Sequence, residues 1–88
     1  MDEHLLIDVV SVQYLDGYRL RLGFDNGVVK VVDLESRLNG EMLEPLRDLE
    51  LFRQVRVDPE IGTIVWPSGA DAAPDTLYEI GETVEAAA

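Results

Sequence analysis

The sequence contains no cysteine and one histidine, His4, among its 88 residues. Without cysteine the chain can form neither a disulfide framework nor a thiolate metal site. Transition-metal sites usually take several His or Cys ligands, and a lone imidazole near the N-terminus does not supply them. The sequence therefore predicts no metal site and no cofactor. The lack of cysteine also fits a reducing compartment.

Positive charge is scarce as well. Seven Lys and Arg stand against eighteen Asp and Glu, which gives a formal net charge of −11. Nucleic-acid binders need cationic surface to displace counterions from phosphates, and anionic membrane surfaces attract the same kind of surface. We therefore expect no direct binding to nucleic acid or to membranes. One interpretation of the excess of carboxylates is that it keeps the protein soluble. A more specific interpretation is that it attracts a basic protein partner.

Long hydrophobic runs are missing, because Asp, Gln or Gly interrupts each apolar stretch. The N-terminal residues 1–4 are acidic where a signal peptide needs positive charge, so a cytoplasmic location is expected. Hydrophobic residues nevertheless make up 47% of the chain, too many for a disordered acidic tail. This length and composition predict a single α+β domain over residues 1–80, followed by an acidic, alanine-ending tail over 81–88 that frays.

The first third of the chain predicts a meander of three antiparallel strands, at about 6–14, 18–24 and 28–33. From residue 18 to residue 24 apolar and polar residues alternate, which is the period of a half-buried strand. Arg19, Arg21 and Lys30 are expected together on the face opposite the apolar one. That second face is expected to remain uncovered.

Two turn signals predict the register of this meander. Asn26-Gly27 favours a two-residue hairpin loop, and residues 15–17 favour a three-residue loop with Gly17 left-handed. The resulting register would pair Phe24 with Val29, Leu22 with Val31, Tyr14 with Tyr18, Val12 with Leu20 and Val10 with Leu22.

The middle of the chain predicts short helices near 34–39 and 46–55, with Gly40 as a stop between them. Asp48 is a candidate cap, and the second helix would place Leu49, Phe52 and Val55 on the core. Strands are expected again at 56–58 and 62–66, followed by a helical turn from Pro74 to Glu79. The predicted fold is therefore α+β, with a mostly antiparallel sheet of about five strands and one or two short helices inserted after the third.

Catalytic patterns are not found. The three serines lie outside any nucleophile-elbow motif, and no glycine loop joins a strand to a helix as a phosphate site requires. Asp71 and Asp75 could contribute to a weak hard-cation site, but capping by Asp75 is the simpler interpretation. Close pairs of carboxylates are unavoidable in so acidic a chain and indicate nothing by themselves. The sequence predicts that the protein is not an enzyme.

The most unusual segment surrounds the single tryptophan. Large aromatic residues beside a rigid, proline-framed loop are natural anchors for recognition. An alternative interpretation is structural: Trp66 and Tyr78 would pack on each other and hold the C-terminal segment to the sheet, with the indole N–H bonded locally. The candidate interaction residues are Trp66, Pro67, Ser68, Gly69, Ala70, Asp71 and Tyr78.

Several of these segments together resemble a known family. They are Phe24-Asp25-Asn26-Gly27, Val32-Asp33-Leu34, Val55-Arg56-Val57-Asp58, the run from Gly62 to Asp71, and Thr76-Leu77-Tyr78. From about Val9 to Tyr78 the chain resembles the bacterial domain of unknown function 2442 family, and the Trp-Pro-x-Gly-Ala-Asp segment is the most specific part, with Ser68 where Asn is common. The resemblance implies a small α+β domain in a bacterial cytoplasm. It implies no catalytic residues, because the family has no established activity.

Two classes of function follow from the sequence. The first is a non-enzymatic protein-interaction module, including an antitoxin-like or regulatory role, because some relatives are encoded beside a second small protein and others carry a helix-turn-helix domain. A homodimer is one form of this class. The second is a small-ligand sensor or minor enzyme that uses a cleft near Trp66 and Tyr78.

Overall fold

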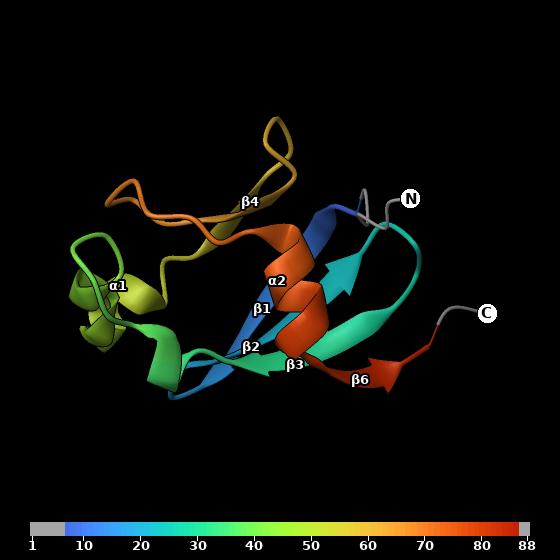
Figure 1. Ribbon diagram of the computed structural model, residues 1–88, viewed down its shortest axis with the longest axis horizontal. Helices are drawn as coiled ribbons and strands as arrows, with labels where there is room; N and C mark the ends of the chain where they lie inside the picture. Colours follow the sequence, from blue (N-terminus) through green and yellow to red (C-terminus); the bar gives the residue numbers. More distant parts are fainter. Residues whose placement is uncertain (1–6, 87–88) are drawn as a thin grey trace.

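The computed structural model describes residues 7–86 and has the predicted α+β class. A four-stranded antiparallel sheet has the order β1-β2-β3-β6, and a separate hairpin pairs β4 with β5 (Figure 1). The strands are β1 (Val9–Asp16), β2 (Arg19–Phe24), β3 (Val29–Asp33), β4 (Arg56–Asp58), β5 (Thr63–Val65) and β6 (Glu82–Glu85). The 3-10 helices are η1 (Glu35–Arg37) and η2 (Glu44–Arg47), and the α-helices are α1 (Leu49–Phe52) and α2 (Pro74–Ile80). The meander and the short helices after it are confirmed, whereas the later strands form their own hairpin instead of joining one sheet.

The loop between β2 and β3 has three residues, and the predicted two-residue loop is wrong. The amide of Phe24 donates to the carbonyl of Val28 at 2.9 Å, and Gly27 N donates to the carbonyl of Phe24 at 3.0 Å. Gly27 alone of the loop residues has a positive φ, +89°, whereas the two-residue type needs two. The register therefore pairs Leu22 with Lys30 and Leu20 with Val32.

This shift of one residue moves Lys30 to the face predicted for Val29 and Val31. Because successive side chains of a strand point to opposite faces, Lys30 lies on the core face with Leu22, and the prediction that it joins Arg19 and Arg21 is wrong. The two valines lie on the opposite face of the sheet, where both are half-buried.

The first hairpin also differs from its prediction. Asp16 pairs with Arg19, so only Gly17 and Tyr18 form the loop, and Tyr14 pairs with Leu20 while Val12 pairs with Leu22. The ladder is irregular between Val9 and Ser11 and between Tyr14 and Asp16. An extra residue in one strand reverses which side chains face the core. Accordingly Val9 is buried and Val10 is 55% exposed, although Val10 was predicted on the apolar face.

The helices between β3 and β4 are shorter than the predicted helix over 46–55. Asp48 caps α1 as predicted, because its side chain accepts a hydrogen bond from Glu50 N at 3.0 Å. Phe52 is fully buried and Val55 packs against the core, as expected. Leu49 is 41% exposed and does not belong to the core, since a helix of one turn presents few positions to it.

Residues 82–85 form β6 at the edge of the sheet, so the predicted fraying over 81–88 is wrong for this part of it. β6 pairs antiparallel with β3, and Arg21 forms an ion pair with Glu85 at 3.3 Å. Gly81 allows the chain to pass close to the sheet, because a Cβ there would lie 2.9 Å from Val32 Cγ1. Residues 87–88 and 1–6, with His4, lie outside the described part.

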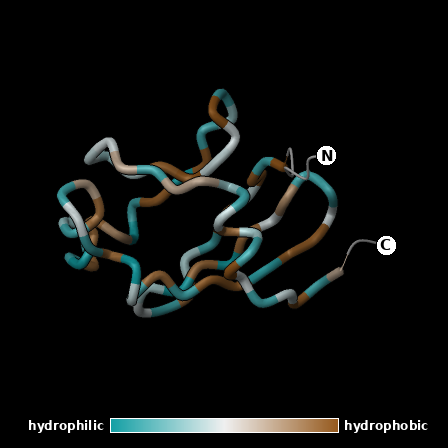
Figure 2. The backbone as a smooth tube through the Cα atoms, in the orientation of Figure 1, coloured by the Kyte–Doolittle hydropathy of each residue, from teal (hydrophilic) through white to brown (hydrophobic). Residues whose placement is uncertain are grey.

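The core lies between one face of the four-stranded sheet, α2 and the segment that carries η1, η2 and α1 (Figure 1). Figure 2 shows hydrophobic and hydrophilic residues alternating along the strands, as a sheet with one covered face requires. The largest fully buried side chains belong to Phe52, Leu20, Leu22, Leu46, Ile64, Leu77, Val9 and Val32. Within residues 7–86 no helix has the length and apolar character needed to cross a membrane.

Candidate functional site

Trp66 is a core residue. Its side chain is 3% exposed, and its indole Nε1 donates to the carbonyl of Phe52 at 2.9 Å. The Trp66 and Phe52 ring centroids lie 5.7 Å apart, and Tyr14 and Tyr18 contact Phe52 edge-on at 6.2 and 5.2 Å. Buried aromatic groups of this kind contribute strongly to stability and satisfy their polar atoms locally. The indole ring therefore anchors the segment that follows it and is not itself a surface anchor.

Tyr78 belongs to a second aromatic cluster. Its ring packs edge-on against Phe24 at 5.0 Å, and the Lys30 ammonium lies 4.0 Å from its centroid. Lys30 Nζ also donates to the carbonyl of Tyr78 at 2.6 Å, and Asn26 Nδ2 donates to the Tyr78 hydroxyl at 3.1 Å. Since Trp66 and Tyr78 pack on different aromatic partners, the prediction that they pack on each other is wrong. The prediction of a local bond to the indole N–H is confirmed.

Residues 66–70 form a tight turn whose tip is exposed. Trp66 N donates to the carbonyl of Ala70 at 2.9 Å, and Gly69 N donates to the carbonyl of Trp66 at 2.9 Å. Gly69 has φ of +94°, which an L side chain rarely adopts. Pro67, Ser68 and Gly69 are exposed, whereas Ala70 is 1% exposed. The predicted interaction segment is thus divided between a buried base and an exposed tip.

Asp71 follows this turn and pairs by its backbone with Val65, which continues the hairpin. Its side chain is exposed and makes no hydrogen bond or ion pair among residues 7–86. Of the predicted residues, Pro67, Ser68, Gly69 and Asp71 are therefore the exposed ones. Tyr78 lies within α2, and its ring contacts Phe24.

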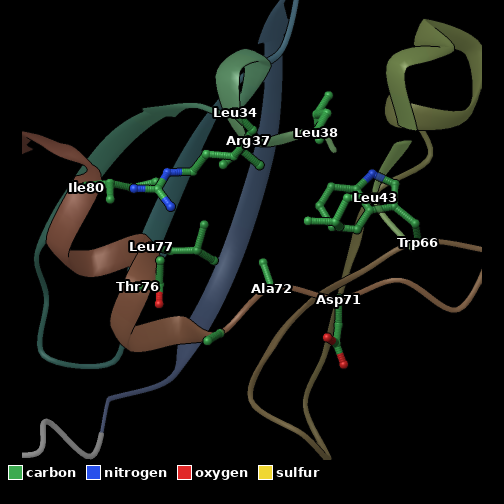
Figure 3. Close-up of a pocket in the computed structure, with 11 residues that line it drawn as sticks. Leu34, Arg37, Leu38, Leu43, Trp66, Asp71, Ala72, Thr76, Leu77 and Ile80 are labelled. Carbon is green, nitrogen blue, oxygen red and sulfur yellow. The ribbon is translucent and has the colours of Figure 1, made fainter. Parts of the chain in front are cut away.

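A pocket of about 240 Å³ opens between Trp66, α2 and η1 (Figure 3). The predicted cleft was placed near both Trp66 and Tyr78, and this pocket is lined by Trp66 and not by Tyr78. The side of α2 that faces it carries Thr76, Leu77 and Ile80, which recur at helical spacing. The lining residues are Leu34, Arg37, Leu38, Leu43, Trp66, Asp71, Ala72, Ala73, Thr76, Leu77 and Ile80.

Most of the residues of this pocket, and Arg37 in particular, were not predicted from the sequence. Leu34 and Leu38 fall in the segment predicted to form a short helix near 34–39, and nothing local to Arg37 distinguishes it from the other arginines. Figure 3 shows the Arg37 side chain extending beside α2 toward Ile80, while the Asp71 carboxylate extends away from the labelled leucines. Within residues 7–86 the Arg37 guanidinium forms no hydrogen bond and no ion pair.

Polar groups are few at this site. Within the described residues no group of three or more His, Cys, Asp and Glu could hold a metal ion. Every buried side-chain nitrogen or oxygen described has a hydrogen-bond partner, so none is left over as an unexplained polar group. The arrangement is a mainly apolar pocket to which Arg37, Asp71 and Thr76 add polar groups, beside an exposed turn.

The fold and the site together define a small α+β domain with a pocketed surface. The chain matches the model of the family described as "Protein of unknown function (DUF2442)" over residues 9–83, and it belongs to that family. No curated protein and no solved structure matches it.

Proposed function

We propose that this chain is a non-enzymatic interaction module that receives a basic protein partner at the exposed turn Pro67–Gly69 and the acidic surface around it. The observation that carries the proposal is the unneutralised charge. Sixteen of the eighteen Asp and Glu fall within residues 7–86, since only Asp2 and Glu3 precede them, and ion pairs within that range involve only Asp16 and Glu85. The remaining carboxylates are available to attract a cationic surface.

The exposed turn supplies a rigid feature within this acidic surface. Its base is held by the buried Trp66 ring and by two backbone hydrogen bonds, so a partner would meet it already ordered. Binding to a preformed surface avoids the entropic cost of ordering a loop. Complementary charge would act mainly by raising the association rate.

This proposal includes a bacterial cytoplasmic setting and, as a more specific form, an antitoxin-like or regulatory role toward a protein encoded nearby. Both rest on the family. Self-association is the alternative form, with the uncovered sheet face or an edge strand as the contact. Sedimentation at high protein concentration tests it, because a persistent monomer would exclude it.

The test of the leading form compares two exposed aspartates. Asp71→Lys changes charge beside the turn at 66–70, and Asp25→Lys makes the same change in the loop between β2 and β3. The tagged wild-type chain captures partners from lysate of its own organism at about 50 and about 200 mM salt, and the association rate of the purified partner is then measured with each variant. We expect a partner enriched at low salt, and Asp71→Lys to slow association roughly tenfold while Asp25→Lys slows it by less than about threefold. If the two variants slowed association equally, the interface would not lie at the turn.

The pocket beside Trp66 favours a second candidate function, the binding of a small ligand. Its mainly apolar lining is that of a small-molecule site, and its volume of about 240 Å³ suits a ligand smaller than a drug-sized molecule. A sensor of this kind would use no catalytic group.

A further inference from the structure

The pocket lies where four separate segments meet. η1 and the residues on either side of it contribute Leu34, Arg37 and Leu38, and the following loop contributes Leu43. The segment from Trp66 to Ala73 and the helix α2 provide the remaining walls (Figure 3). Leu38, Trp66 and Leu77 are each no more than 3% exposed, so the walls are fixed by the core. A dry cavity of about 150 Å³ binds benzene, so a pocket of 240 Å³ suits a body of roughly ten non-hydrogen atoms.

The lining determines the chemistry of that body. Four leucines, one isoleucine, two alanines and the indole face a ligand with carbon, and only Arg37, Asp71 and Thr76 add polar groups. Apolar contact would therefore supply most of the affinity, as in most small-molecule sites. A linear or aromatic hydrocarbon group fits this lining.

Arg37 determines which polar group a ligand in this pocket would carry. Most of the other cations are engaged: Arg19 and Arg21 form ion pairs, Lys30 and Arg47 donate to backbone carbonyls, and Arg53 lies over the Tyr14 ring. Arg37 makes no such contact within residues 7–86, and its side chain extends along the pocket wall beside α2 (Figure 3). A guanidinium presents a planar fork of donors that matches a carboxylate.

The net charge of −11 does not exclude an anionic ligand at this position. At physiological salt, exposed charges farther than about 8 Å are largely screened, so the nearest group dominates. In the view of Figure 3 the Asp71 carboxylate extends away from the apolar wall, whereas Arg37 lies along it.

We propose that this pocket binds a small apolar monocarboxylate, with the hydrocarbon body among Leu38, Leu43 and Leu77 and the carboxylate on the Arg37 guanidinium. The inference rests on the second candidate function above and is independent of the protein partner proposed for the turn at 66–70. The ligand class covers medium-chain fatty acids and arylalkanoic acids.

The tryptophan supplies the measurement, because Trp66 is the only one in the chain and lines the pocket. The purified chain is titrated with octanoate, with 3-phenylpropionate and with 3-phenylpropionamide, which keeps the shape and removes the charge. We expect the acids to change Trp66 fluorescence with Kd between about 0.1 and 1 mM, and the amide to bind roughly tenfold more weakly. Arg37→Gln should reduce acid binding about tenfold and leave amide binding unchanged.

Two further variants separate charge from shape. Arg56 is exposed, lies on β4 outside the pocket lining and has no ion pair within residues 7–86, so Arg56→Gln removes the same charge without touching the site. It should leave Kd within about twofold of the wild-type value. Ala72→Leu narrows the pocket and should weaken acid and amide alike.

The proposal is overturned by any of three results. One is equal affinity for the acid and the amide, which would show that the carboxylate does not contribute to binding. Another is an Arg37→Gln variant that binds the acids as the wild type does. The last is a chain whose fluorescence and melting temperature both stay unchanged up to about 10 mM of each acid. None of these results bears on the Asp71→Lys comparison, so the two proposals fail separately.

Discussion

Two loops of this protein have the same backbone design. In each, the amide of an aromatic residue donates to the carbonyl four residues later, and a glycine amide donates back to the aromatic residue's carbonyl. The first loop runs from Phe24 to Val28 and the second from Trp66 to Ala70. The glycines, Gly27 and Gly69, have φ of +89° and +94°. This is the geometry of a three-residue hairpin loop that ends in a left-handed glycine.

The side chains of the two loops differ. In the first, Asn26 Oδ1 accepts from Val28 N at 3.0 Å and Asn26 Nδ2 donates to the Tyr78 hydroxyl at 3.1 Å, so the loop is attached to itself and to α2. In the second, Pro67 sets the backbone and Ser68 makes no side-chain hydrogen bond within residues 7–86. The loop at 24–28 is thus bonded through its side chains to the rest of the protein, whereas the side chains at the tip of the loop at 66–70 remain available. For this reason the proposed interaction surface includes only the loop at 66–70.

The largest expected effect comes from the aromatic residues that open the loops. Truncating a buried Phe or Trp costs about 3–5 kcal/mol of unfolding free energy. We expect Trp66→Ala near the upper end, since it also leaves the carbonyl of Phe52 without its donor, and Phe24→Ala near the lower end. Urea unfolding followed by circular dichroism measures both. A Trp66→Ala variant as stable as the wild type would show that the indole is not part of the core.

Substituting either loop glycine by alanine should lower the unfolding free energy by a smaller amount, nearly the same for both. Alanine at a left-handed position costs about 1–2 kcal/mol, and a Cβ at Gly69 would meet no atom within 4 Å, so the cost there is backbone strain alone. Gly27→Ala and Gly69→Ala should therefore each lower the unfolding free energy by about that amount in the same urea experiment. Asparagine, which tolerates this conformation better, serves as the control at both positions. No difference between Ala and Gly would contradict the shared loop design.

Much of the fold follows from sequence pattern, because local physics determines it. The alternation over 18–24 gives β2, Asp48 caps α1 and Pro74 begins α2. The registers do not follow in the same way. A three-residue and a two-residue loop both satisfy Asn26-Gly27. The observed three-residue loop places Lys30 on the face where it bonds to Tyr78, a contact at a sequence separation of 48 that no local pattern reveals.

The same reason explains β6 and the pocket. Residues 82–85 have no strong strand pattern, and they pair because Gly81 lets the chain lie against β3. Trp66 was recognisable as an anchor from its sequence context. The place of Arg37 at the pocket was not, because it depends on three other segments that meet beside it.

The smallest effects distinguish the two loop tips. Asn26→Ala removes two side-chain hydrogen bonds and should cost about 1–1.5 kcal/mol, whereas Ser68→Ala should change stability by less than about 0.5 kcal/mol. Both are measured by urea unfolding against the wild type. A loss at Ser68 equal to that at Asn26 would mean that the second loop is also a structural connection.

A double-mutant cycle sharpens this last comparison. Tyr78→Phe keeps the ring on Phe24 and removes only the hydroxyl that accepts from Asn26, so the two substitutions together should cost less than their sum by about 0.5–1 kcal/mol. Tyr14→Phe is the control, because the Tyr14 hydroxyl donates to the carbonyl of Gly17 and shares no partner with Asn26, so its cycle with Asn26→Ala should be additive. If the Asn26–Tyr78 cycle is additive as well, the hydrogen bond from Asn26 does not stabilise the loop at 24–28 against α2. That loop would then be no more firmly held by its side chains than the loop at 66–70. The reason for assigning the partner to Pro67–Gly69 would then rest on Asp71→Lys and Asp25→Lys alone.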